Sequence, residues 1–355
     1  MKRLLAVLAA SVLLVSLIAY FDTRNGTRTD GLYYKASGIH PDAQLLKVNG
    51  EVVSAEEYLY WLASVCDYLY SYSGGTVDFN GQVTEDMTYG EYAKSDAGKT
   101  VTLYMVIRAW AREEGLELRE EDLQALEKQH QEYVTYYGSE EAYLQQIKLL
   151  GITPELMDSI NAVPYLYAQL HDLYCEEGGR LRPSDEELEQ FGTENGYLTA
   201  HLLYFPTAGL DDAGVEEARA KAQEYADRWK QAEDSLAAFA ALSEELELSA
   251  PENGITVDKL STDASVYQGI EALATGEISG VIQGTNGFYV AMRIELDDDA
   301  LTEDLFNQHL QELQDSAKVD YNDRLYDSID VSAFYTQLLA ERTVLSAEME
   351  QSAGE

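Results

Sequence analysis

The sequence predicts an α+β protein in which helices from both ends of the chain flank a smaller mixed domain. Apolar residues recur at helical spacing through much of residues 46–192 and again through 300–340. Between these regions, residues 196–296 favour a β-α-α-α-β-β order of elements. A chain of 355 residues is long enough for about two or three domains.

The chain begins with a segment typical of export. Lys2 and Arg3 precede an uncharged apolar run over residues 4–20, which is long enough to enter a bilayer. No Ala-x-Ala cleavage site ends the run, and no cysteine follows it at lipoprotein distance. We therefore expect residues 1–21 to remain as a single-pass membrane anchor, with the body on the extracytoplasmic side. Secretion after cleavage at Ala19 is the alternative.

The helical domain is expected over residues 46–192, behind a polar spacer at residues 22–45 that shows no periodicity. Ser54 and Glu57 form a capping-box pattern that predicts the start of its first helix. Gly178-Gly179 followed by Pro183 predicts its boundary with the mixed domain.

The C-terminal region is too apolar for a free tail. Its apolar residues are Tyr321, Leu325, Ile329, Val331, Phe334 and Leu338. We expect helices over residues 300–340 to pack on the N-terminal domain, because such side chains would otherwise face water. Residues 341–355 are acidic and small, which predicts a disordered tail.

Charge and cysteine content exclude several functions. The formal net charge of −40 argues against nucleic-acid binding, because phosphate contacts need clustered Lys and Arg. A solvated acidic surface is favoured over a dedicated site for cations or basic polypeptides, because no calcium-type Asp-x-Asp-x-Asp-Gly loop is present. Cys66 and Cys175 lie on separate predicted helices, with no C-x-x-C motif and no histidine at metal-ligand spacing, so we expect no metal, no thiol-redox role and no cofactor. Two buried thiols are favoured over a disulfide.

One stretch, residues 269–294, combines the strongest local signals. Gly276 is placed to end a helix in the left-handed conformation, and residues 277–282 then read as extended. Asn286-Gly287 predicts a hairpin turn, and residues 288–294 alternate as a half-buried strand would.

This stretch resembles the closing segment of parvulin (PpiC-type) peptidyl-prolyl isomerases, L-x-x-GE-[IV]-S-x-[PV]-[IV] … GYH-[IV]. The matching positions are Leu273, Gly276, Glu277, Ile278, Ser279, Val281, Ile282 and Gly287. Near the N-terminus, VNGEVVSAEEYLYWL is similar to the opening of the helical domain of SurA and PrsA type foldases. The resemblance implies a helical chaperone domain, completed by the C-terminal helices, around a parvulin-like domain at residues 196–296.

The resemblance also implies where a site would lie. Prolyl isomerisation needs no nucleophile and no cofactor, because its barrier is the amide resonance lost on twisting. Parvulins grip the proline in an apolar pocket beside two facing histidines. His201, in Ala-His-Leu-Leu, matches the first histidine, and Tyr289 stands at the second, which packs against the first. The substrate pocket would be lined by Thr262, Val266, Tyr267 and Phe288.

The alternative for His201 is a core histidine on a buried strand with one satisfied hydrogen bond.

The 26 tyrosines also allow two interpretations. Packing between helices is favoured, and lining a groove for extended polypeptides is the second.

The function expected is that of a peptidyl-prolyl cis-trans isomerase-like foldase that assists exported proteins, with weak catalysis because Tyr289 replaces a histidine. A non-catalytic chaperone or holdase, or an envelope scaffold, is the alternative. The expected partners are unfolded or folding exported polypeptides, with no nucleic acid and with membrane contact through the N-terminal helix. The sequence predicts no oligomeric state.

Overall fold

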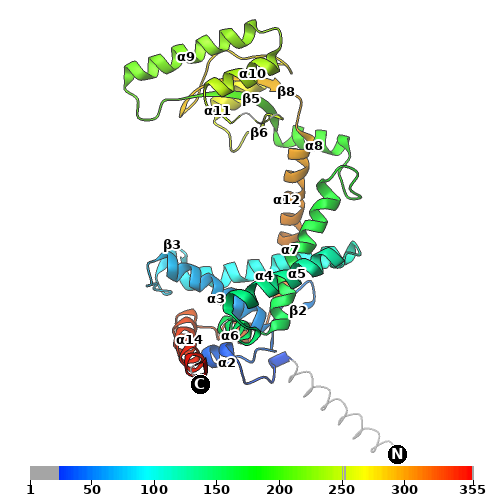
Figure 1. The fold of residues 1–355 in the computed structure, drawn as a ribbon, viewed down its shortest axis with the longest axis vertical. Helices are drawn as coiled ribbons and strands as arrows, with labels where there is room; N and C mark the ends of the chain where they lie inside the picture. Colours follow the sequence, from blue (N-terminus) through cyan, green and yellow to red (C-terminus); the bar gives the residue numbers. More distant parts are fainter. Residues whose placement is uncertain (1–23, 250, 252, 354–355) are drawn as a thin grey trace, which may run out of the picture. The chain divides into compact units, whose positions relative to one another are not determined.

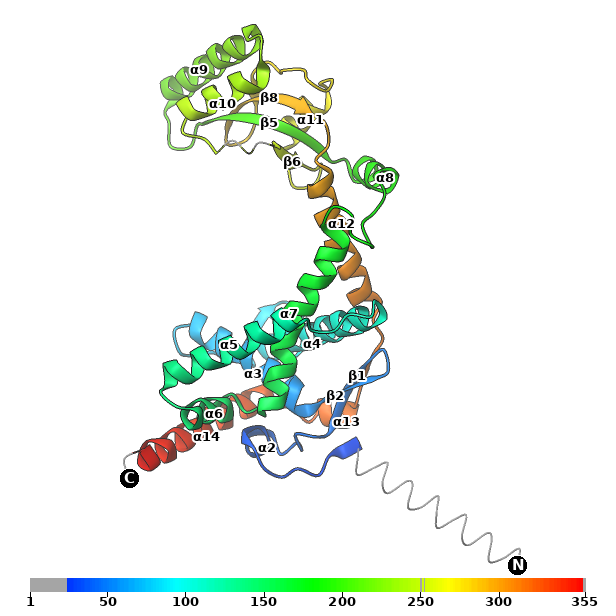
Figure 2. The ribbon, with the colours of Figure 1, turned by 45° about the vertical axis from the view of Figure 1, so that its right-hand side comes forward.

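The computed structural model describes residues 24–249, 251 and 253–353, and the chain divides into two compact units. Unit 1 contains the chain up to Leu170 together with the chain from Leu310 onward, and unit 2 contains His171–His309. Figures 1 and 2 show the blue helix α2 beside the red helix α14, so segments from both ends of the chain meet in unit 1. The expected anchor at residues 1–21 lies outside the described residues. Within the described ranges, no helix is long and apolar enough to cross a bilayer.

Unit 1 is mainly helical around a small antiparallel sheet with the strand order β2-β1-β9. Its strands are β1 (Gln44–Val48), β2 (Glu51–Ser54), β9 (Val319–Tyr321) and a separate short pair, β3 (Gln82–Thr84) and β4 (Met87–Thr88). Its helices are α2 (Leu32–Ser37), α3 (Ala55–Tyr72), α4 (Tyr89–Glu113), α5 (Glu120–Tyr137), α6 (Glu140–Leu150), α7 (Pro154–Cys175), α13 (Asp323–Tyr326) and α14 (Val331–Ala353). The last turn of α7 belongs to unit 2.

The N-terminal hairpin and the C-terminal segment share one core. Asn49 and Gly50 turn between β1 and β2 with positive φ angles of 51° and 87°, which suits an Asn-Gly turn. The Ser54 hydroxyl then accepts a bond from the Glu57 backbone N at 3.2 Å and caps α3. On the other side of β1, β9 adds a third strand, with Leu46 opposite Tyr321.

Two expectations for the ends of the chain are wrong. The spacer at residues 22–45 is largely structured, because Leu32 and Tyr33 are buried and the Tyr33 hydroxyl donates to the Leu150 carbonyl at 2.5 Å. The tail expected from residue 341 continues α14 to Ala353. Arg342 holds that helix, because its Nη1 lies 2.8 Å from an Asp67 carboxylate oxygen on α3. Both segments contain few apolar residues, so periodicity did not predict their structure. Their burial depends on elements that are far away in sequence.

Unit 2 contains a four-stranded antiparallel sheet with the order β6-β5-β8-β7. Figure 1 labels β5, β6 and β8 of this sheet and the helices α9, α10 and α11 near it. Its elements are α8 (Asp185–Asn195), β5 (Leu198–Pro206), α9 (Asp212–Gln231), α10 (Ser235–Glu245), β6 (Ile255–Val257), α11 (Ala264–Glu271), β7 (Ile282–Gln283), β8 (Gly287–Ile294) and α12 (Asp298–Ser316), of which the part after His309 belongs to unit 1. The expected β-α-α-α-β-β order therefore gains one strand, β6, between the second and third helices. That strand is only three residues long and becomes extended by pairing with β5.

The two faces of this sheet support separate cores. Alternate residues of β5 point to opposite sides. Leu203 and Phe205 pack with Trp229 and Phe239 of α9 and α10. Ala200 belongs to the cluster formed by α11. This alternation decides which candidate site residues can meet.

Candidate functional site

His201 lies on the sheet face that packs against α9 and α10. Its side chain is 3% exposed, and its ring lies against Phe239 with centroids 4.4 Å apart. Burial lowers the pKa of His201, which favours the neutral imidazole. Its Nδ1 has no hydrogen-bond partner among the residues that the structure describes, so this atom lacks the satisfied bond expected of a core histidine.

Tyr289 lies on the opposite face. The antiparallel register of β5 and β8 places His201 opposite Met292, and it places Tyr204 opposite Tyr289. Residues directly opposite in an antiparallel pair project to the same side, so Tyr289 shares its side with Tyr204, three residues beyond His201. The Tyr204 and Tyr289 rings stack with centroids 4.8 Å apart. The expected packing of position 289 against His201 is therefore wrong.

The predicted substrate-binding residues are divided in the same way. Val266 and Tyr267 of α11 are buried in the cluster that also contacts Tyr289. Phe288 packs on the other face, in the cluster of α9 and α10. Thr262 lies half-buried in the loop before α11. The structure thus brings Tyr289, Val266 and Tyr267 together and separates them from Phe288.

Asp263 is a residue near Tyr289 that the sequence analysis missed. Its carboxylate caps α11 by accepting bonds from the Ser265 and Val266 backbone N atoms at 2.9 and 3.2 Å. It also accepts bonds from the Thr285 hydroxyl and, at 2.9 Å, from the Thr285 backbone N. These bonds, led by the hydroxyl, lower the pKa of Asp263 to about 2. An aspartate before a predicted helix was the available signal.

The Tyr289 phenol is held in its protonated form. Burial raises its pKa, with smaller contributions from Tyr204 and from the Asp263 carboxylate. A protonated phenol can donate a hydrogen bond to an amide carbonyl, but it cannot act as an imidazole does in accepting and returning a proton near neutral pH.

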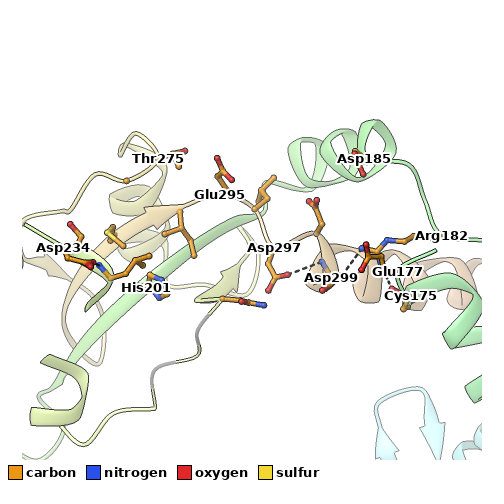
Figure 3. A pocket seen from close by; sticks show the side chains of 18 of the residues that line it. Cys175, Glu177, Arg182, Asp185, His201, Asp234, Thr275, Glu295, Asp297 and Asp299 are labelled. Atoms are coloured by element: carbon orange, nitrogen blue, oxygen red, sulfur yellow. Dashed lines mark hydrogen bonds and ion pairs between the residues drawn. The ribbon is translucent and has the colours of Figure 1, made fainter. Parts of the chain in front are cut away.

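A cavity of about 1500 Å³ opens beside His201 and is lined on that side by Met292 and Ile294. Figure 3 shows His201 and Asp234 at one end and Cys175, Arg182 and Asp299 at the other. Its acidic lining residues are Glu176, Glu177, Asp185, Glu233, Asp234, Glu295, Asp297, Asp298 and Asp299. This acidic cavity is larger than a typical small-molecule pocket of about 300–1,000 Å³ and suits a basic polypeptide segment.

One group of side chains in the described part of the chain has donor atoms close enough to hold a metal ion. It comprises His171 and Cys175 on α7 and Glu303 on α12. The expectation of no metal-binding spacing overlooked that His171 stands one helical turn before Cys175. The third donor could not be found from spacing, because Glu303 lies 132 residues after His171. Both cysteines of the chain are free thiols.

No protein-family model matches the chain, and no curated protein matches it. The chain is similar to solved PrsA and SurA-like foldases. The foldase protein PrsA from Streptococcus pneumoniae is 19% identical, with a TM-score of 0.21, and the match covers 75% of this chain and 93% of that one. PrsA from Bacillus subtilis is 15% identical, with a TM-score of 0.23 and coverage of 74% and 93%. A structure described for PEB4 and Cj1289, two SurA-like chaperones of Campylobacter jejuni, is 15% identical, with a TM-score of 0.22 and coverage of 78% and 98%. Values this low assign no role to any residue.

Proposed function

We propose that this chain is an extracytoplasmic folding factor that binds unfolded or folding exported polypeptides and has little or no prolyl isomerase activity. The observation that carries the proposal is the register of β5 and β8, which places His201 and Tyr289 on opposite faces of one sheet. A catalyst of this kind must bring its polar groups to the same twisted amide. Two groups separated by a sheet cannot do so.

The energetic consequence is large. The amide barrier is about 18–20 kcal/mol, and an enzyme lowers it only with groups oriented toward the developing transition state. Losing one such group costs on the order of 3 kcal/mol, which is about a hundredfold in rate. His201 is neutral and packed on Phe239, and Tyr289 remains a phenol, so neither replaces the missing partner.

Polypeptide binding is supported by surfaces on each unit. In unit 1, Tyr68 and Tyr72 of α3 are 64% and 81% exposed and stack with centroids 6.1 Å apart. Exposed tyrosines offer apolar contact area and a polar tip at low entropic cost. In unit 2, the acidic cavity offers a complementary field for Lys and Arg side chains.

Prolyl isomerase activity is the second candidate function. It is favoured by the resemblance at residues 269–294 and by the position of His201 on the wall of the acidic cavity. The extracytoplasmic location proposed here rests on the charged and apolar pattern of residues 1–21.

Two assays on the full chain separate these functions. A protease-coupled assay on a proline peptide measures isomerisation beside a parvulin that retains both histidines. We expect kcat/KM at least about a hundredfold below that control. A second assay follows suppression of aggregation of an unfolded client, and we expect suppression near equimolar chain. Isomerisation within about tenfold of the control would establish the enzyme instead.

A matched pair of variants tests the binding surface. Replacing both Tyr68 and Tyr72 by serine should weaken aggregation suppression, because it removes exposed contact area without disturbing the core. Leu260→Ser is the control, since Leu260 is an apolar residue of unit 2 that is 96% exposed. Equal suppression by both variants would remove the aromatic pair of α3 from the client-binding surface.

A further inference from the structure

We propose that His171, Cys175 and Glu303 form a binding site for a zinc-type divalent cation. The two α7 residues are four positions apart and therefore lie on one face of the helix. Glu303 comes from α12, and its Oε2 lies 2.5 Å from His171 Nε2. The three donor atoms all lie within 4.8 Å of one another. This site is independent of the proposed function.

The two helices are held together around these donors. The His171 ring meets Phe306 of α12 edge-on, with centroids 5.2 Å apart, and Phe306 is fully buried. Arg182 donates to the Cys175 backbone carbonyl and forms an ion pair with Asp299 at 2.9 Å. The end of α7 is thus fixed against the start of α12, so the donors are brought together without the ion.

The donor set selects the class of metal. Imidazole nitrogen, thiolate sulfur and carboxylate oxygen are the ligands of zinc, whereas Mg²⁺ and Ca²⁺ prefer oxygen alone. Tetrahedral zinc with bonds of about 2.0–2.3 Å separates its donors by about 3.3–3.7 Å. Small side-chain rotations would widen the 2.5 Å His–Glu contact and bring the other donor separations, which are all within 4.8 Å, into this range.

The fourth position is open to water. The His171 and Glu303 side chains are 32% and 45% exposed, so an ion between them reaches solvent. Three protein ligands and one water is an arrangement that zinc accepts.

The charges of the ion and of its ligands balance. Binding breaks the S–H bond, forms a sulfur–zinc bond and releases the proton to solvent. The thiolate and the carboxylate together then balance the two positive charges of the ion.

The alternative to a zinc site is an ordinary His–Glu ion pair beside a thiol that binds nothing. His130 and Glu140 in unit 1 form such a pair at 3.0 Å, with no cysteine in the group. This second pair serves as an internal control. Cys66, buried in α3, is the matching control for an uninvolved thiol.

The experiment titrates the reduced full chain with Zn²⁺, and with Co²⁺ as a spectroscopic probe, in excess Mg²⁺ to occupy the acidic surface. We expect one tightly bound ion per chain and a cobalt–thiolate charge-transfer band. Cys175→Ser should abolish the band. It should also weaken zinc binding by at least about 10- to 100-fold, which is the loss seen when a group that only hydrogen-bonds to a metal ligand is removed. Glu303→Gln, which preserves side-chain shape, should also weaken it.

Cys66→Ser and His130→Ala should bind like the wild type. Zinc should also raise the melting temperature of the wild type and not that of Cys175→Ser, because an ion that binds only the folded state stabilises it. Zinc binding that is equal in the wild type and Cys175→Ser, or cobalt binding without a thiolate band, would show an adventitious ion only and overturn the proposal. Circular dichroism shows whether each variant is folded. If Cys175→Ser is not folded, zinc binding by Glu303→Gln supplies the test.

Discussion

His201→Leu should leave unit 2 as stable as the wild type, or more stable, at pH 7.5. Leucine has a similar volume and removes the buried Nδ1, which has no partner in the described structure. An unsatisfied buried polar atom costs about 1–3 kcal/mol. The ring contact with Phe239 that is lost contributes about 0.5–1.5 kcal/mol. The difference runs from a loss of about 0.5 kcal/mol to a gain of about 2.5 kcal/mol in the free energy of unfolding, with a central value of about 1 kcal/mol of gain.

The same variant should change the pH dependence of stability. Burial lowers the pKa of His201 in the folded chain below the value of about 6.5 expected when unfolded. Between these two values the unfolded chain binds more protons, so wild-type stability falls as the pH falls through this window. Each unit of pKa difference is worth about 1.4 kcal/mol. The advantage of His201→Leu should therefore grow between pH 7 and pH 5.

Urea unfolding followed by Trp229 fluorescence measures the free energy of unfolding of unit 2 at each pH, because Trp229 is fully buried beside Phe239 in that unit. Replacing Trp61 and Trp110 by Phe in every variant removes the signal of unit 1. Met292→Leu is the control, since Met292 faces His201 across the strands and does not titrate. Loss of more than about 1 kcal/mol in His201→Leu at pH 7.5, or an unchanged pH profile, would refute the assignment of His201 as an unsatisfied core residue.

Phe334→Ala should lower the free energy of unfolding of unit 1 by about 3–5 kcal/mol, because Phe334 is 2% exposed in the shared core, while calorimetry should show the unit 2 transition unchanged. Gly151→Ala should destabilise unit 1 more than Gly138→Ala in chemical denaturation. Both glycines have positive φ, but an added Cβ at Gly151 would lie 2.6 Å from the Tyr33 ring, whereas nothing lies within 4 Å at Gly138. Equal losses would show that the ring can move aside. The native N-terminus should retain its apolar segment by intact mass; a mature chain beginning at Tyr20 would mean secretion instead.

Local chemistry made several elements predictable from the sequence. Ser54 caps α3 as its hydroxyl and spacing require, and Asn49-Gly50 turns because both residues accept positive φ. Gly276 likewise adopts a positive φ of 83°. Each of these features depends on residues within one turn or one hairpin, so the surrounding fold was not needed to predict it.

Contacts between distant segments were decided by the tertiary structure. The third strand of the unit 1 sheet joins Leu46 to Tyr321, and the metal-capable group joins His171 to Glu303. The spacer and tail were misjudged for the same reason, because their few apolar residues are buried by partners that local periodicity does not identify.

The candidate site shows most clearly which features the local sequence determines and which the tertiary structure decides. The sequence determined that His201 and Tyr289 belong to two strands, and the alternation along each strand followed from that. It could not determine their register, because strand pairing is set by the turn, the edge strands and the packing of α9, α10 and α11 together. A shift of one residue would have placed both side chains on one face. The tertiary structure pairs His201 with Met292, and this register separates the two residues.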